Sequence, residues 1–106
     1  MSAERSEPTE PPSVRWFWKH GERRLEVDGE IVLTIFSPPG SSRWRCATDG
    51  EHYRWMRTKP KPLGANEVSV SPLQREGVKL LRSRVAREHA RLERILEAID
   101  RMDLGT

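Results

Sequence analysis

The chain has 106 residues, of which 35% are hydrophobic and 33% charged, and its formal net charge is +3. This length suits one domain with a thin core, because such a chain buries only about two thirds of the surface that its unfolded form exposes. The sequence has no run of about 18 apolar residues, so we expect no membrane-spanning segment.

Residues 1–13 are predicted to form a disordered tail. Three prolines stand among Ser, Thr and Glu, a composition that buries too little apolar surface to offset the entropy of the chain. The segment carries three glutamates and lacks the apolar stretch of a secretory signal. The single cysteine, Cys46, cannot form an internal disulfide, which fits a reducing compartment. We therefore expect a cytoplasmic protein.

Residues 14–58 are predicted to form an antiparallel sheet of four or five strands. From Val14 to Lys19 the side chains alternate with the period of two that a half-buried strand requires. Asp28-Gly29 and Asp49-Gly50 each separate two strand-like segments, and Asp-Gly is a strong hairpin signal. Residues 59–70 are predicted to be a linker, because their prolines cannot continue a strand ladder. The pattern indicates a β-meander with two Asp-Gly hairpins.

The second hairpin also predicts which side chains share a face of the sheet. A two-residue turn at Asp49-Gly50 would place Arg45 opposite Arg54. The same register would pair Cys46 with Tyr53, and it would pair Trp44 with Trp55. One face would then be an aromatic core, formed by Trp16, Trp18, Trp44, Cys46, Tyr53 and Trp55.

The other face is predicted to be basic and to bind a macromolecule. Residues 14–62 hold ten basic and six acidic side chains, so the positive charge of the chain belongs mainly to the sheet. Cations can bind phosphates and aromatic rings can stack on bases, although glutamates within the sheet can also neutralise such a face. The candidate residues on this face and in the loop after it are Arg15, Phe17, Lys19, Arg43, Arg45, Arg54, Arg57, Lys59 and Lys61.

Residues 71–103 are predicted to form one long amphipathic helix. Ser71 and Gln74 match a capping box, and Pro72 suits the first turn. Such a helix would be about 48 Å long, whereas a six-residue strand spans about 20 Å, so the sheet cannot cover it. Either the helix breaks near Gly77 or its distal half pairs with another chain. The residues predicted to pair follow a heptad interrupted at Glu88 and are Val78, Leu81, Val85, Leu92, Ile95, Ile99 and Met102.

The sequence does not indicate an enzyme, because its reactive side chains do not converge. His20 lies in a turn, His89 lies on the helix, and the predicted register places Cys46 and His52 on opposite faces. The spacing of these residues fits no metal site, and no phosphate-binding or nucleophile motif is present. We therefore expect no cofactor, no metal and no small-molecule substrate.

These patterns together predict an α+β protein with a four- or five-stranded antiparallel meander followed by one long C-terminal amphipathic helix. The preferred function is that of a small non-catalytic binding or regulatory protein, homodimeric through its helix, that engages another protein as a phage-type or bacterial accessory regulator or inhibitor. One alternative is a nucleic-acid-binding protein that uses the basic face. Another is an assembly subunit whose helix joins a larger bundle.

Overall fold

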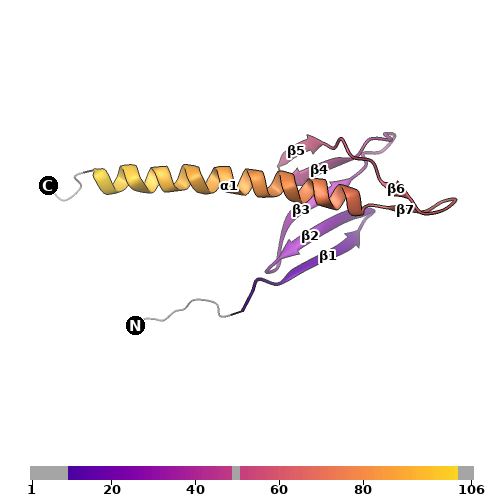
Figure 1. Cartoon of the computed structure of the whole chain (residues 1–106), viewed down its shortest axis with the longest axis horizontal. Coiled ribbons are helices and arrows are strands. Elements are labelled where there is room, and N and C mark those ends of the chain that lie inside the picture. Colours follow the sequence, from indigo (N-terminus) through magenta and orange to yellow (C-terminus); the bar gives the residue numbers. More distant parts are fainter. Residues whose placement is uncertain (1–9, 49–50, 103–106) are drawn as a thin grey trace. The chain divides into compact units, whose positions relative to one another are not determined.

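The computed structural model describes residues 10–48 and 51–102, and the chain divides into two compact units, residues 1–57 and 58–106. The first unit contains a five-stranded sheet, and the second contains a short hairpin followed by one long helix (Figure 1). The predicted α+β fold is confirmed.

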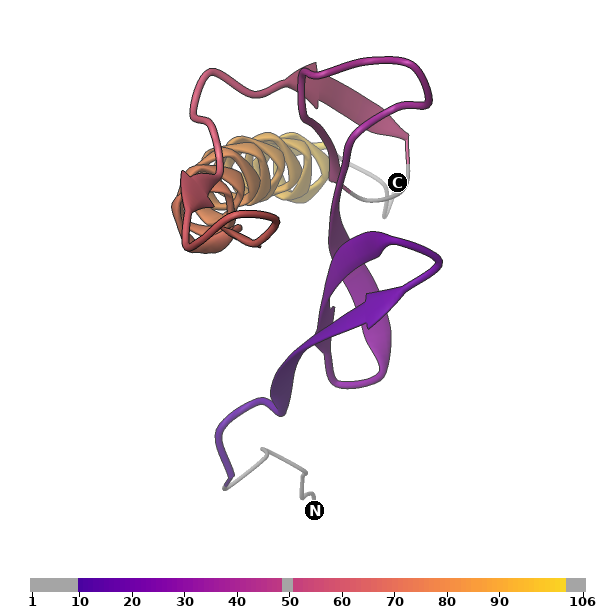
Figure 2. The same cartoon turned by 90° about the vertical axis from the view of Figure 1, so that its right-hand side faces the viewer.

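The sheet is an antiparallel meander in which each strand pairs with the next along the chain, in the order β1-β2-β3-β4-β5. Figure 2 shows that it is strongly twisted. The strands are β1 (Val14–Lys19), β2 (Glu22–Val27), β3 (Glu30–Phe36), β4 (Arg45–Thr48) and β5 (His52–Trp55).

Two-residue turns connect the first three strands. His20-Gly21 and Asp28-Gly29 both have positive φ values at each residue, from 50° to 86°. This backbone follows the right-handed twist of the flanking strands, which is why Gly and Asp suit it. Ser13 further ties the second turn to the start of β1, because its N–H donates to Asp28 Oδ1 at 2.8 Å.

The pairing of β4 with β5 differs by one residue from the sequence-based prediction. Thr48 lies opposite His52, so the connection comprises residues 49–51 rather than two residues. Arg45 consequently lies opposite Trp55. The predicted pairs Arg45–Arg54, Cys46–Tyr53 and Trp44–Trp55 are therefore wrong. The turn conformation predicted for Asp49-Gly50 falls on residues outside the described range.

This shift changes the faces of β5, because strand side chains alternate with a period of two. Tyr53 and Trp55 were predicted to be core residues, but they are 51% and 44% exposed and point to the face opposite the core. Trp18 is 52% exposed, and Trp16 is half-buried. The buried side chains that the register places together on the core face are Leu25, Leu33, Ile35, Cys46 and Thr48.

The second unit begins with a short hairpin inside the segment that the sequence predicted to be a linker. Its strands are β6 (Lys61–Pro62) and β7 (Val68–Ser69). The Leu63 N–H donates to the Glu67 carbonyl at 2.9 Å and extends the pairing past Pro62, which has no N–H to contribute. The Thr58 N–H donates to the Glu76 carboxylate at 2.8 Å and ties the start of the unit to the helix.

The helix α1 (Ser71–Arg101) runs without a break for 31 residues, which corresponds to about 46 Å. A break near Gly77, one of the two predicted alternatives, is therefore wrong. Figure 2 views α1 nearly end-on and shows one continuous coil. Within residues 10–48 and 51–102, no helix is both long enough and apolar enough to cross a membrane.

The start of α1 is fixed by the backbone and not by the predicted capping box. The N-cap is Val70, and no side chain caps it. The Gln74 N–H donates to the Val70 carbonyl at 2.9 Å, and the Ser71 N–H donates to the hydroxyl of Ser69 at 3.3 Å. The expected role of Ser71 as the cap is wrong, whereas Pro72 does lie in the first turn as predicted.

Candidate functional site

Arginine and aromatic side chains are in mutual contact on the exposed face of β4 and β5. The guanidinium carbon of Arg45 lies 4.7 Å from the ring centroid of Tyr53 and 5.2 Å from that of Trp55. Arg43 lies over the Trp55 ring at 4.7 Å. The Tyr53 ring also meets Phe36 edge to face, with centroids 6.3 Å apart. All three cation distances fall within the roughly 6 Å of a cation–π interaction. These five residues are called the arginine–aromatic cluster.

The strand register brings the cluster together. Arg45 lies directly opposite Phe36 on β3 and opposite Trp55 on β5, so all three share one face. Tyr53 precedes Trp55 by two residues and therefore points to the same side. The cluster thus follows from the three-residue connection between β4 and β5.

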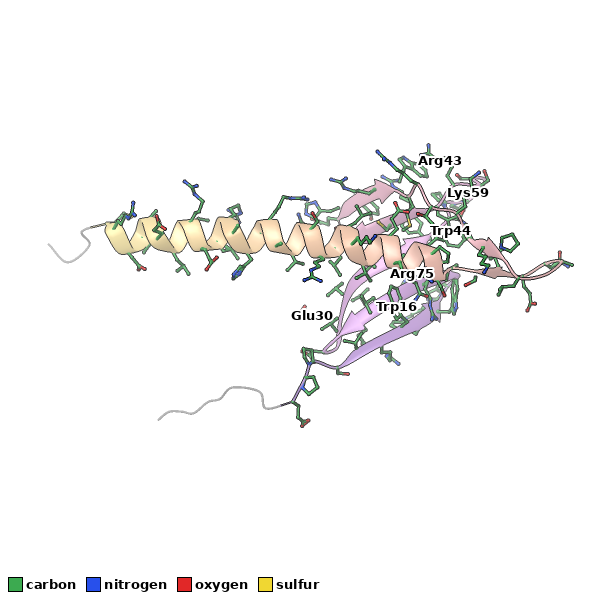
Figure 3. All side chains as sticks on the ribbon, viewed as in Figure 1. Trp16, Glu30, Arg43, Trp44, Lys59 and Arg75 are labelled. Carbon is green, nitrogen blue, oxygen red and sulfur yellow. The ribbon has the colours of Figure 1, made fainter. Side chains whose placement is uncertain are left out.

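The loop before β4 holds the backbone of Arg43 in place. The Arg43 N–H donates to the Ser41 hydroxyl at 3.1 Å, and the Ser37 hydroxyl donates to the Arg43 carbonyl at 3.1 Å. Arg43 and Trp44, which directly precede β4, are labelled in Figure 3. These short serine contacts explain why a loop residue takes part in an ordered contact with a strand residue.

Among the residues that the structure describes, the arginines at the β4–β5 end of this face have no ion-pair partner. In the described part of the chain, neither Arg43 nor Arg45 forms an ion pair, and the buried Nε of Arg45 has no hydrogen-bond partner. The β1–β2 end differs, because Arg15 pairs with Glu26 and Arg24 pairs with Glu22, each at 2.7 Å. Within the described residues, the two arginines of the cluster are therefore cations that no carboxylate pairs.

Only some of the predicted binding residues come together. Arg15, Phe17 and Lys19 lie on the same face as the cluster, because Phe17 pairs with Arg24 and the register carries that face across the sheet to β5. Arg54 lies apart from them, on the core side of β5 opposite Cys46. The other predicted residues are Arg57, which follows β5, and Lys59 and Lys61, which belong to the second unit.

Sequence reasoning missed the aromatic members of the cluster. Tyr53 and Trp55 were placed in the core because a two-residue Asp-Gly turn was assumed. Glu51 was the available signal, since an Asp-Gly pair followed by one further polar residue also fits a three-residue hairpin loop, which is the next most common length.

The second candidate surface is the apolar stripe of α1. Six of the seven residues predicted to pair are exposed by 40% or more: Val78, Val85, Leu92, Ile95, Ile99 and Met102. The seventh, Leu81, is half-buried. Figure 3 shows side chains projecting from the helix along its whole described length. An exposed stripe of this regularity is typical of a helix that pairs with another helix.

The potentially reactive side chains are scattered over separate elements. His20 lies in the β1–β2 turn and His89 on α1, while Cys46 is buried in β4. His52 shares the core side of the sheet with Cys46, so the prediction that they lie on opposite faces is wrong. Among residues 10–48 and 51–102, no three His, Cys, Asp or Glu side chains are grouped as metal ligands.

The chain was compared with known proteins in three ways. No protein-family model, no curated protein and no solved structure matches it.

Proposed function

We propose that the chain is a small non-catalytic binding protein, acting in the cytoplasm, whose arginine–aromatic cluster engages a partner protein as an accessory regulator or inhibitor. The observation that carries this proposal is the exposure of Tyr53 and Trp55 beside two arginines without an ion pair among the described residues. Trp, Tyr and Arg are the residues that most often dominate the energy of protein interfaces. A partner surface with carboxylates around an apolar patch would complement them.

The ring contacts favour a protein over a nucleic acid. Stacking on bases requires accessible ring faces. Arg45 lies over Tyr53, two guanidinium groups lie over Trp55, and Arg15 lies over Phe17 at 4.6 Å. A base that stacked on the ring faces covered by these guanidinium groups would have to displace an arginine, whereas a carboxylate can bind the outer edge of a guanidinium without disturbing it.

The exposed stripe of α1 supports a second part of the proposal, that two copies of the chain form a homodimer. The heptad pattern from Val78 to Met102 contains eight inner positions, which is long enough for a coiled coil of several helical turns. The same stripe also fits a subunit of a larger helical bundle, and the solution mass separates the two, since a bundle gives a mass above that of two chains.

The cluster can be tested by comparing two variants of the same hairpin. Arg45→Glu reverses a charge within the cluster, and Arg54→Glu makes the same change on the other face of β5. We expect a partner captured by the unchanged protein to bind the Arg54→Glu variant almost equally. Its affinity for Arg45→Glu should fall at least about thirtyfold, the loss typical of an interface hot spot. The affinities are measured with the purified partner by calorimetry.

Two results would overturn the proposal. One is equal loss of binding in both variants, which would mean that only net charge matters. The other is tight binding of a mixed-sequence DNA or RNA probe that weakens steeply with salt and depends on Arg43 and Arg45, because that is the behaviour of a nucleic-acid site.

A further inference from the structure

We propose that two copies of the chain pair through α1 in antiparallel orientation, related by a two-fold axis that crosses the helix pair at the level of Ala90. This inference rests on the homodimer proposed above and specifies its geometry. It follows from the heptad positions, the volumes of the side chains and the placement of one ion pair.

The inner heptad positions of α1 lie at equal sequence distances on either side of Ala90. The inner positions, alternately called a and d, are Val78, Leu81, Val85, Glu88, Leu92, Ile95, Ile99 and Met102. In an antiparallel pair each a residue lies level with a d residue of the other helix. When the axis passes Ala90, residues equally distant from position 90 lie at the same level. Each of the eight inner positions then lies level with an inner position of the other helix.

Side-chain volumes match in this arrangement. The small Val78 lies level with the partner's Met102, and the small Val85 lies level with the partner's Ile95. The amino-terminal half of α1 also has a shallow apolar groove, lined by Val78, Leu81, Arg82, Val85, Ala86 and His89. The larger side chains of the carboxyl-terminal half, including the 59% exposed Leu96, would fill this groove from the partner. A parallel pair would instead place each Val opposite the same Val.

The charged residue within the stripe argues most strongly for this orientation. Glu88 occupies an inner position and binds Arg91 on the next turn, with three N–O distances from 2.7 to 3.2 Å. The Glu88 carboxylate thereby raises the pKa of the Arg91 guanidinium above its usual value. Both side chains lie within two residues of the proposed axis.

In a parallel pair, the two Glu88 side chains would face each other in one layer of the interface. Like charges buried opposite each other are unfavourable, because neither is compensated by the other helix. In the antiparallel pair, each Glu88 lies level with the partner's Leu92 and about 1.5 Å along the axis from the level of the partner's Arg91. The two ion pairs then form one neutral group of four side chains.

Cysteine cross-linking tests the orientation directly. Val85→Cys and Ile95→Cys are made separately in full chains that carry Cys46→Ala, and circular dichroism verifies that each variant is folded. Antiparallel pairing places Val85 level with the partner's Ile95, whereas two copies of either residue lie about 15 Å apart along the axis. We expect a disulfide-linked dimer when the two variants are mixed and almost none from either variant alone.

Two results would contradict these expectations. Disulfide-linked dimers from each variant alone, without a mixed product, would overturn the antiparallel orientation while leaving the homodimer standing. A monomeric mass at all concentrations would overturn both the orientation and the homodimer. The sheet-binding proposal is tested separately by Arg45→Glu, which does not alter α1.

A charge exchange tests the central group of four. Arg91→Glu would gather four carboxylates at the axis, and we expect the dimer Kd to rise at least about tenfold. Adding Glu88→Arg restores opposite charges and should return the Kd to within about threefold of its original value. Arg101→Glu is the matched control, because Arg101 pairs with Glu97 on the outward side of α1. Equal effects of Arg91→Glu and Arg101→Glu, measured by sedimentation, would contradict the antiparallel geometry.

Discussion

Arg45 is the residue on which the arginine–aromatic cluster depends. Its guanidinium lies over both Tyr53 and Trp55, while its buried Nε has no hydrogen-bond partner among the described residues. Leaving a buried donor unsatisfied costs free energy. The cation–π contacts with the two rings oppose that cost. The side chain is therefore held by contacts that only a flat cation can make in full.

Replacement of Arg45 should lower the stability of the sheet modestly. We expect Arg45→Ala to reduce the free energy of unfolding by about 1 kcal/mol, because both ring contacts are lost. Arg45→Lys should lose roughly half of that, since an ammonium group covers one ring less completely. Urea unfolding measures both changes. Arg54→Ala is the control, and a loss for this variant as large as that for Arg45→Ala would contradict the special role of the cluster.

Leu33 is the residue that should matter most to the core of the sheet. Its side chain is fully buried on the core face, whereas Ile31 in the same strand is 39% exposed. We expect Leu33→Ala to reduce the free energy of unfolding by about 2–5 kcal/mol through lost burial and the cavity that remains. Ile31→Ala should cost roughly 1 kcal/mol or less. Similar losses in the two variants, measured by thermal and urea unfolding, would show that the core is not centred on Leu33.

In the β4–β5 hairpin, the length of the connection decides which side chains lie on the exposed face. Its connection has three residues, and the register places Tyr53 and Trp55 beside Arg45. A shift of one residue would move both rings to the core face and bring Arg54 to the cluster. The difference of one residue between two permitted loop lengths thus decides whether these rings form a core or an exposed aromatic surface.

Deletion of Glu51 tests this register. In the observed pairing, Thr48 and His52 would then be joined by Asp49-Gly50 alone, which is a favoured length for a hairpin, so the cluster should survive. We expect the near-ultraviolet circular dichroism of the aromatic residues to be unchanged and the free energy of unfolding to change by about 0.5 kcal/mol or less. A changed spectrum with a clear loss of stability would support the other register.

Periodicity made the larger elements predictable from the sequence. The alternation in β1 and the heptad of α1 each repeat over many residues, so a local exception such as Glu88 does not hide them. The register of β4 with β5 could not be predicted, because Asp-Gly occurs in hairpin loops of more than one length. The candidate site was therefore only half predicted: Arg43 and Arg45 were identified, but their aromatic partners were assigned to the core.

Short elements carried too little signal to be predicted. The strands β6 and β7 have two residues each, which is too few for an alternating pattern. The N-cap of α1 was predicted one residue too late, because the Ser71 and Gln74 pattern resembles a capping box although Val70 is the N-cap. Here the Gln74 N–H donates to the Val70 carbonyl and the Ser71 N–H donates to the Ser69 hydroxyl, whereas a capping box would use the side chains of Ser71 and Gln74 as the acceptors.

At the scale of the whole molecule, the two proposed surfaces belong to different units of the chain. The arginine–aromatic cluster lies in residues 1–57, and the apolar stripe lies in residues 58–106. A dimer formed through α1 would carry two copies of the cluster, and a partner with two matching sites would then bind with increased avidity. Pairing that depends mainly on apolar side chains should also resist salt, because salt screens charges but not the burial of apolar surface.

Sedimentation equilibrium of the full chain at low and high salt, with and without a mixed-sequence nucleic-acid probe, tests most directly whether α1 joins two copies and whether the cluster excludes nucleic acid. The mass of one chain is 12.3 kDa. We predict twice this mass at both salt concentrations and no change when the probe is added. A mass of one chain at every concentration would contradict the pairing of α1, and a probe complex that dissociates as salt rises would contradict the assignment of the cluster to a protein partner.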